Sequence, residues 1–336
     1  MGGATRTMRV SVIATVKNES GSVTSLLESL YGQTCQPDEV VIVDGGSSDD
    51  TVQQLQAWQG RLPLRVLVEP GCNISQGRNI AIRVAQGPLI ACTDAGAWAN
   101  PSWLANLLHP FTAKDREEIA PVVACGFFVP EATTAFETAM GATALPALAD
   151  VRPERFLPSS RSVAFPKSAW EAIGGYPEWL DYCEDLILDL RLLARGYRFV
   201  FVPDAIVHFR PRSNLGAFFR QYYRYARGDG KADLWRRRHA VRYLTYGIAL
   251  PALLTLALTR NPLWIAPLLL GAIVMLWTPY KRLLPALRTL GLRERVAAVL
   301  WVPLIRATGD IAKMVGYPVG LYWRWRHRRE IPRWRD

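Results

Sequence analysis

The chain has 336 residues, of which 50% are hydrophobic and 21% are charged, a balance that excludes global disorder and allows more than one structural unit. The formal net charge of +11 gathers beside apolar stretches in the last third of the chain, which favours anionic membrane lipids as the partner of the basic residues. A nucleic-acid surface is the alternative, but no aromatic-interleaved sheet motif accompanies the charge, so no nucleic-acid partner is expected. Five cysteines without C-x-x-C spacing are expected to be reduced thiols rather than a zinc site. The first strand-like run continues directly into polar residues, so it is not expected to be a signal peptide.

The first hundred residues alternate between two kinds of hydrophobic pattern. Helical patterns cover residues 22–31, 49–58 and the region around 80–84, and strand-like runs lie between them at residues 8–14, 39–43, 64–68 and 88–92. This alternation predicts an α/β fold, with a mostly parallel, Rossmann-like sheet sandwiched between helices. In such sheets, ligands bind beyond the carboxyl ends of the strands.

Polar residues follow the first two of these strands. Asn18 and Glu19, after Thr15, can reach the base and ribose of a nucleotide or can simply cap the next helix. Asp44 ends a buried strand and is the candidate for direct contact with a ligand, and Gly46 would let a planar ligand approach the backbone.

Two more charged residues are candidates for a phosphate or metal site. Arg78 is expected in the first turn of a helix, where it could pair with a diphosphate, although an ordinary surface arginine is the alternative. Asp94, two residues before Gly96, could hold a ribose hydroxyl or a metal ion, or could only close a turn.

After about residue 120 the regular alternation weakens. Strands are expected at residues 122–129, 162–165 and 198–202, and a helix at 215–225. Between them, Glu184 and Asp185 open a short amphipathic stretch that ends at Gly196. A carboxylate beside a second carboxylate in a partly closed site should have a raised proton affinity, which suits a base near neutral pH.

The C-terminal region is apolar. Residues 243–259 and 261–280 carry no charge, and each approaches the roughly 20 apolar residues that span a bilayer. Arginine-rich segments flank both outer ends, which predicts a hairpin with both ends cytoplasmic; two buried core helices are the alternative. A further stretch, about 294–323, is interrupted by charged residues and is expected to be an interfacial amphipathic or re-entrant helix.

Taken in order, the motifs between about residues 8 and 230 resemble those of the family 2 glycosyltransferases, which are inverting enzymes of the GT-A fold. The segments that carry the resemblance are Ser11–Glu19 (opening strand and nucleotide loop), Val43–Ser47 (base-binding Asp segment), Gly77–Asn79 (Arg-Asn helix start), Thr93–Gly96 (the D-x-D position), Gly174–Glu178 followed by Glu184-Asp185 (G-G-[FY]-x-E … E-D), and Gln221–Tyr225 (Q-x-x-R-W with Tyr for Trp).

The resemblance implies a cytosolic GT-A domain over residues 1–230 and a membrane region over 231–336, at a bacterial plasma membrane. Its donor would be a nucleotide-diphosphate sugar, with uridine favoured, and its acceptor a lipid-linked molecule or a glycan. By this resemblance Asp185 would be the catalytic base, with Glu184 as its neighbour. The residues implied for the donor are Thr15, Asn18, Glu19, Asp44, Gly46, Arg78, Asp94 and Gly96, and those implied for the acceptor or diphosphate are Arg210, Gln221, Arg224 and Tyr225.

One position departs from the family pattern. The third residue of the D-x-D segment is Gly96, so the carboxylate that normally meets Mg²⁺ or Mn²⁺ is missing. Either Asp94 and a second ligand, for which His208 is the candidate, hold the cation, or arginines such as Arg78 and Arg210 neutralise the diphosphate. The departure also leaves open a membrane-anchored nucleotide-sugar-binding protein without transferase activity. A nucleotidyltransferase would require a glycine-rich loop with Arg or Lys after the first strand, which residues 15–19 do not form.

Overall fold

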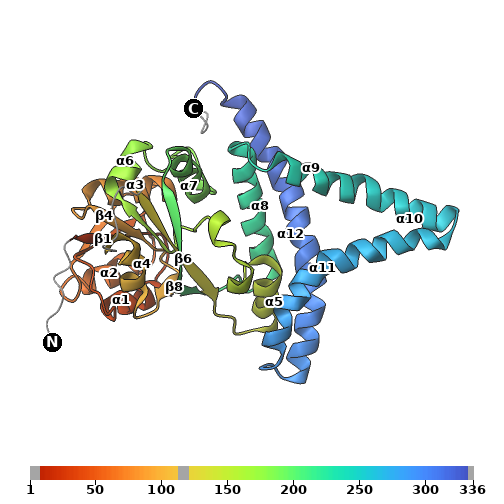
Figure 1. Ribbon diagram of the computed structural model, residues 1–336, viewed down its shortest axis with the longest axis horizontal. Helices are drawn as coiled ribbons and strands as arrows, with labels where there is room; N and C mark the ends of the chain where they lie inside the picture. Colours follow the sequence, from red (N-terminus) through yellow and green to blue (C-terminus); the bar gives the residue numbers. More distant parts are fainter. Residues whose placement is uncertain (1–7, 113–120, 332–336) are drawn as a thin grey trace. The chain divides into compact units, whose positions relative to one another are not determined.

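The computed structural model describes residues 8–112 and 121–331, and the chain divides into two compact units. The first unit comprises the described residues up to Glu131 together with Val151–Arg210, and the second comprises Ala132–Asp150 and the described residues from Pro211 onward (Figure 1). The division therefore differs from the expected boundary near residue 230, because the helix at 215–231 and the segment 132–150 belong with the C-terminal helices.

Within the described residues, eight strands of the first unit form one sheet in the order β3-β2-β1-β4-β7-β6-β8-β5. The strands are β1 Val10–Val16, β2 Glu39–Asp44, β3 Leu64–Val68, β4 Leu89–Cys92, β5 Ala97–Ala99, β6 Val122–Pro130, β7 Val163–Pro166 and β8 Arg198–Phe209. Strands β1 to β4 are mutually parallel, whereas β7 runs antiparallel to β4 and β6, and β5 runs antiparallel to β8. The predicted parallel sheet is confirmed.

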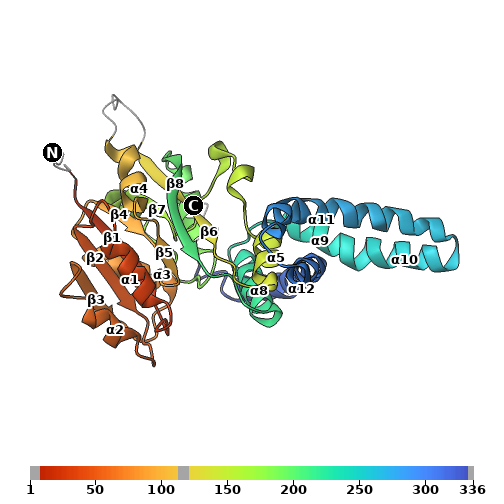
Figure 2. The ribbon, with the colours of Figure 1, turned by 90° about the horizontal axis from the view of Figure 1, so that it is seen from below.

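Helices cover both faces of this sheet (Figures 1 and 2). They are α1 Val23–Tyr31, α2 Thr51–Ala57, α3 Ile74–Val84, α4 Trp103–Thr112, α6 Lys167–Ala172 and α7 Glu184–Ala194. On one face Val41 and Val43 pack with Ile82 of α3 and Leu192 of α7 in one buried cluster. The intervening residue Ile42 is also fully buried. Strands buried on both faces explain why the sequence runs are continuously apolar rather than alternating.

Two strands differ from the sequence-based expectation. β5 has three residues, too few to produce a readable pattern. β8 continues well beyond residue 202, although Pro203 lies within it, because its pairing with β6 shifts register between Cys125 and Phe127 and leaves Pro203 exposed at the irregularity. The extension carries His208 into the sheet, where it pairs with Trp98 of β5.

The second unit is helical. Its helices are α5 Ala135–Ala144, α8 Leu215–Lys231, α9 Arg236–Leu244, α10 Leu250–Thr259, α11 Ile265–Leu287 and α12 Leu292–Arg326. Glycines bring α8 and α12 into backbone contact: a Cβ atom at Gly320 would lie 2.1 Å from the Arg227 carbonyl oxygen, and one at Gly230 would lie 2.3 Å from that of Tyr317. α12 is a continuous helix of 35 residues, longer than the expected segment 294–323.

α12 nonetheless has two faces. Val302 and Ile305 are buried in a cluster with residues of α5, α8 and α11. Apolar side chains at helical spacing on its other side, among them Leu300 (62% exposed) and Val315 (49%), face solvent. This pattern agrees with the amphipathic character expected for residues 294–323.

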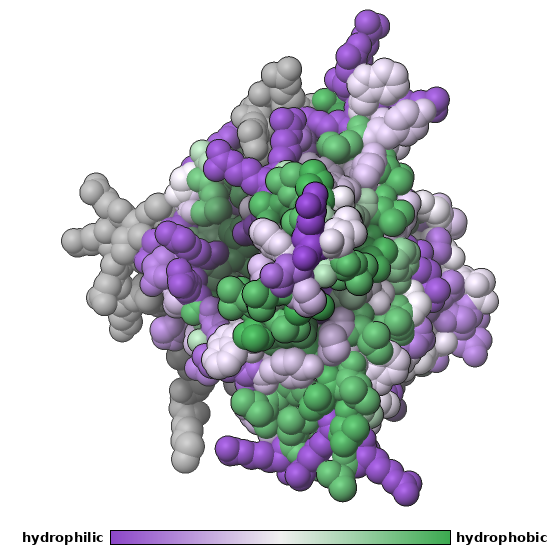
Figure 3. Space-filling view, turned by 90° about the vertical axis from the view of Figure 1, so that its right-hand side faces the viewer, coloured by the Kyte–Doolittle hydropathy of each residue, from purple (hydrophilic) through white to green (hydrophobic). Residues whose placement is uncertain are grey.

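Two helical segments, Arg236–Thr259 and Pro262–Leu287, are long and apolar enough to cross a membrane. A π-helical turn at Thr245–Ala249 joins α9 to α10 within the first segment. Only 6% of the apolar window in each segment is buried, so they are not the core helices of the alternative interpretation. Leu258 and Leu263 are 86% and 75% exposed, and Figure 3 shows a broad area of hydrophobic residues on the face that this hairpin turns to the viewer.

Candidate active site

The loops after β1 and β2 are held together by the residues that the sequence singled out. The Asn18 backbone N–H donates to Ser47 Oγ (2.8 Å), and Asn18 Oδ1 accepts from the Ser48 N–H (2.8 Å). Asn18 has a φ of 56°, in the left-handed region that asparagine tolerates better than most residues. The Glu19 carbonyl accepts from the N–H groups of Ser22 and Val23 in the turn that leads into α1, and the role of its side chain stays a prediction.

Asp44 shapes its own loop. Its side chain is fully buried, and Oδ1 accepts from the N–H groups of Gly46 (2.9 Å) and Ser47 (2.8 Å). Gly46 has a φ of 84°, and a Cβ atom there would lie 3.0 Å from Pro70 Cα. The buried Asp44 carboxylate thus holds its own loop, and the neighbouring loop leaves no room for a side chain at position 46. The assignment of Asp44 and Gly46 to the donor stays a prediction.

Thr15 packs against the helix that follows β3. A Cβ atom at Gly77 would lie 2.7 Å from the methyl carbon of Thr15, so β1 and α3 meet closely at this point. α3 begins at Ile74, where Asn73 and Gln76 form a reciprocal capping box. Arg78 therefore lies in the second turn of α3, which corrects the first-turn placement and removes the direct contribution of the helix N-terminus.

The Arg78 guanidinium joins two acids that are far apart in the sequence. Nη1 donates to Glu184 Oε1 (2.6 Å), and Nη2 donates to Asp94 Oδ1 (2.7 Å). The arginine is 2% exposed and its guanidinium carbon lies 5.3 Å from the centre of the Tyr176 ring. Burial alone would lower the pKa of Arg78, but the charges of Asp94 and Glu184 raise it well above its ordinary value. Arg78 thus ties the first turn of α7 to the segment that follows β4.

A second arginine meets the other oxygen of Asp94. Arg161 Nε lies 3.1 Å from Asp94 Oδ2, and its guanidinium lies over the rings of Phe209 (4.6 Å) and Phe128 (5.5 Å). Sequence reasoning missed Arg161, because it stands in an irregular segment before β7 that belongs to no motif.

The acids of α7 differ in environment. Burial and the Asp185 charge raise the pKa of Glu184 to about 7, and Arg78 offsets only part of this effect. Asp189, one turn later and also missed, is 2% exposed, and burial with the Asp185 charge raises its pKa well above the ordinary value. Asp185 itself is partly exposed and accepts a hydrogen bond from the Leu186 N–H (2.8 Å). Asp185 is therefore the member of this group that a ligand can reach.

The expected metal pair does not form. His208 Nδ1 lies 2.7 Å from Glu131 Oε1, and His208 Nε2 lies 2.7 Å from Asn100 Oδ1. Asp94 Oδ1 accepts a hydrogen bond from Arg78, and Oδ2 forms an ion pair with Arg161. Residues 8–112 and 121–331 contain no group of three His, Cys, Asp or Glu residues that could hold a metal ion. Asp94 and His208 thus have separate partners, and the donor set does not fit a divalent cation.

The residues expected on the acceptor or diphosphate side fall in both units. Arg210 directly follows β8 in the first unit, whereas Gln221, Arg224 and Tyr225 lie on α8 in the second. Gln221 Nε2 donates to the Tyr225 hydroxyl (2.7 Å). Their assignment stays a prediction.

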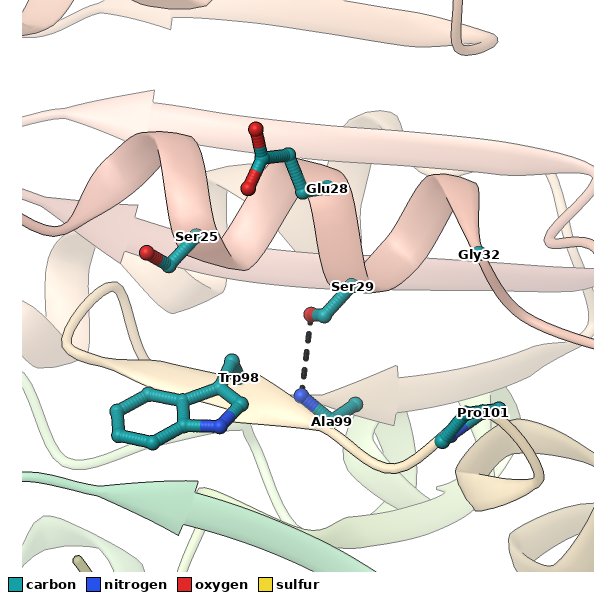
Figure 4. Close-up of a pocket in the computed structure, with 7 residues that line it drawn as sticks. All are labelled: Ser25, Glu28, Ser29, Gly32, Trp98, Ala99 and Pro101. Carbon is teal, nitrogen blue, oxygen red and sulfur yellow. Dashed lines mark hydrogen bonds between the residues drawn. The ribbon is translucent and has the colours of Figure 1, made fainter.

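A pocket of about 460 Å³ lies elsewhere, between α1 and the segment of β5 (Figure 4). The Ser29 hydroxyl there accepts from the Ala99 N–H (3.0 Å). The residues that line it are Ser25, Glu28, Ser29, Gly32, Trp98, Ala99 and Pro101. None of the predicted donor-binding or catalytic residues is among them, so this pocket is distinct from the group around Asp94 and Glu184.

Two family descriptions match the chain. Residues 11–132 match "Glycosyl transferase family 2", and residues 126–304, more than half of the chain, match "Glycosyl transferase family group 2". A relative in Bacillus subtilis (strain 168), the uncharacterized glycosyltransferase YfnE, is 32% identical over 123 residues, which cover 36% of this chain and 30% of that protein. The O-antigen chain rhamnosyltransferase RfbN of Salmonella typhimurium is 22% identical over 231 residues, 63% of this chain and 71% of its own length.

The fold also has a solved counterpart. The mannosyltransferase PcManGT from Pyrobaculum calidifontis, in complex with GDP-Man and Mn²⁺, superposes with a TM-score of 0.55 at 20% identity, covering 97% of this chain and 89% of that one. At this identity the likeness shows the fold, which is the predicted GT-A type. Together, the matched segments and the fold show that the chain belongs to family 2 of the glycosyl transferases.

Proposed function

We propose that the chain transfers a sugar from a nucleotide-diphosphate sugar to a hydroxyl group of a glycan or lipid-linked acceptor, beside a membrane and with inversion at the anomeric carbon. Family membership supports the reaction class. Relatives named for O-antigen chains and for succinoglycan biosynthesis support a glycan-building role.

The single observation that carries the proposal is the linkage Glu184–Arg78–Asp94. It fixes the start of α7, and with it the partly exposed Asp185, beside the carboxyl end of β4. Ligands of open α/β sheets bind at this edge. A base one residue from this anchor is therefore close to where a nucleotide sugar is expected.

In the reaction, the Asp185 carboxylate accepts the proton of the acceptor hydroxyl. The hydroxyl oxygen forms a bond to the anomeric carbon while the bond from that carbon to the diphosphate oxygen breaks, and the nucleoside diphosphate leaves with the electron pair. Charge that develops on this leaving group must be stabilised by cations. A divalent ion, which the resemblance implies and which accompanies the Pyrobaculum enzyme, would have to share Asp94 with two arginines.

The second unit supports a membrane location. The hairpin segments Arg236–Thr259 and Pro262–Leu287 have the length and composition of membrane spans, and basic residues flank their outer ends. We place the catalytic unit on the cytoplasmic side of the plasma membrane, where nucleotide sugars are available.

Asp185→Asn tests this function in the full chain in detergent. UDP-glucose, GDP-mannose and dTDP-rhamnose are offered with an extract of membrane lipids, and both sugar transfer and nucleotide affinity are measured. We expect transfer to fall about 100- to 10,000-fold while nucleotide affinity stays within about threefold. Glu171→Gln, an exposed acid on α6, is the control and should transfer normally.

Two results would contradict the proposal. Near-normal transfer by Asp185→Asn would remove Asp185 from the role of base. Nucleotide binding by the unsubstituted chain without transfer to any acceptor would favour the alternative of a nucleotide-sugar-binding protein, which the Gly96 position motivates.

A further inference from the structure

The Asp94 carboxylate is held between two cations of the protein itself. Its Oδ1 accepts from Arg78 Nη2 (2.7 Å) and its Oδ2 pairs with Arg161 Nε (3.1 Å). The two arginines are not equivalent, because Arg78 is 2% exposed and also bound to Glu184, whereas Arg161 is 22% exposed. Both carboxylate oxygens of Asp94 thus already face a cation of the protein, and a divalent ion would compete there with Arg161, the more exposed of the two arginines.

The surroundings of Arg161 fix the guanidinium in place. The rings of Phe209 and Phe128 lie 4.6 Å and 5.5 Å from its central carbon, and the contact with Asp94 is made through Nε. An arginine has five N–H donors in a rigid fork that matches phosphate oxygens. A guanidinium held by a carboxylate and two aromatic rings keeps its positive charge at a fixed place, which suits it to attract the phosphate groups of a ligand.

Lack of space does not explain why position 96 carries a glycine instead of an acid. A Cβ atom built at Gly96 would have no atom within 4 Å, so a longer side chain has room there. The two acids of a complete D-x-D segment would attract a cation. Here, Asp94 and its two arginine partners carry a net charge of +1. Glu184, whose pKa burial raises to about 7, contributes only part of a negative charge near pH 7, which lowers this net charge without reversing it. This environment disfavours a divalent cation and favours an anion.

We propose that Arg161 replaces the divalent cation at Asp94 and binds the diphosphate of the donor, so that donor binding in this chain requires no metal ion. The inference rests on the proposed function, since it concerns the same donor. During transfer, the guanidinium remains paired with Asp94 and donates hydrogen bonds to the phosphate oxygens that gain negative charge as the sugar leaves.

The first test needs no substitution. The full chain in detergent is titrated with UDP, GDP and dTDP by calorimetry, once with EDTA and once with Mn²⁺. We expect the dissociation constant of the nucleotide that binds to change by less than about threefold between the two conditions. A gain of about tenfold or more with Mn²⁺ would overturn the proposal but leave the proposed function standing. If none of the three nucleotides binds in either condition, both fail.

Substitution of Arg161 separates the diphosphate from the rest of the nucleotide. Arg161→Gln should weaken diphosphate binding in EDTA by about 10- to 100-fold, the range for a lost charge-assisted hydrogen bond, while affinity for the matching nucleoside is unchanged. Arg161→Lys should recover part of the loss, and the exposed Arg198→Gln, with the same change of charge, should lose none. Unchanged diphosphate affinity in a folded Arg161→Gln protein would refute the assignment.

The reverse experiment restores a metal site. Gly96→Asp combined with Arg161→Gln should bind Mn²⁺ alone at least about tenfold more tightly than the unsubstituted chain, and its diphosphate affinity should become dependent on Mn²⁺. Melting temperatures verify that each variant is folded. If the unsubstituted chain binds Mn²⁺ alone as tightly as the double variant, Arg161 does not occupy the cation position and the proposal is wrong.

Discussion

Replacing Arg78 by methionine should destabilise the first unit. The substitution keeps an unbranched apolar side chain but removes the guanidinium that bonds Glu184 at 2.6 Å and Asp94 at 2.7 Å. Removing one partner of a buried ion pair costs about 3–5 kcal/mol, chiefly because the other charge is left without compensation. Glu184 can become neutral at little cost near pH 7, since its pKa is already about 7, so we expect the lower end, about 3 kcal/mol. For a unit of this size, that is a fall in melting temperature of about 6–12 °C.

Scanning calorimetry of the full chain in detergent measures this shift, and hydrogen exchange in peptides from α3 and α7 assigns the transition to the first unit. Arg83→Met provides the matched control, because Arg83 is an exposed arginine on the same helix. The control should stay within about 0.5 kcal/mol of the unsubstituted protein. Lowering the pH to 5 should shrink the effect of Arg78→Met, since Glu184 is then protonated in both proteins. If Arg78→Met and Arg83→Met have the same melting temperature at pH 7, the linkage of Asp94 and Glu184 through Arg78 does not stabilise the fold.

Two further predictions concern stability. The pKa of Glu184 is raised from 4.5 to about 7, so its protonation should add up to about 3 kcal/mol to the free energy of unfolding below pH 4.5, and this stabilisation is lost as pH rises through 7. Melting curves of Glu184→Gln should lack this part of the pH dependence. Identical pH profiles of the two proteins would contradict the prediction. Gly320→Ala should destabilise the second unit by at least about 1–3 kcal/mol, because the new Cβ would lie 2.1 Å from the Arg227 carbonyl oxygen. Gly271→Ala on α11, where a Cβ meets no atom within 4 Å, is the control and should be neutral or stabilising; equal melting of the two alanine variants would refute the close contact of α8 and α12.

Local patterns predicted much of the fold. The parallel strands β1 to β4 and the two apolar helical segments could be predicted, because each is encoded by a continuous apolar run of neighbouring residues. The contact between α12 and α8 could not be predicted, because Gly316 and Gly320 meet backbone atoms of α8 that lie about ninety residues away in the sequence. Helical spacing alone cannot reveal which face of a helix finds a partner.

The site was predictable residue by residue but not as a set of contacts. Asp94 and Glu184 stand in recognisable motifs, yet nothing in either motif indicates that one arginine bonds both. Arg161 reaches Asp94 only because β7 and β8 bring its segment to the same edge of the sheet. The partners of His208 could not be predicted, because Asn100 and Glu131, which contact its ring nitrogens, follow other strands.

The backbone contact between α8 and α12 has a consequence for the segment between them. The helices that precede and follow the apolar hairpin hold each other directly, so the base of the second unit does not depend on the hairpin to close it. The contact closes the segment between α8 and α12 into a loop, and the entropy cost of closing a loop rises only slowly with its length. The hairpin is therefore an insertion between two helices that contact each other directly. In the membrane location proposed above, its length could match the thickness of the bilayer without disturbing that contact.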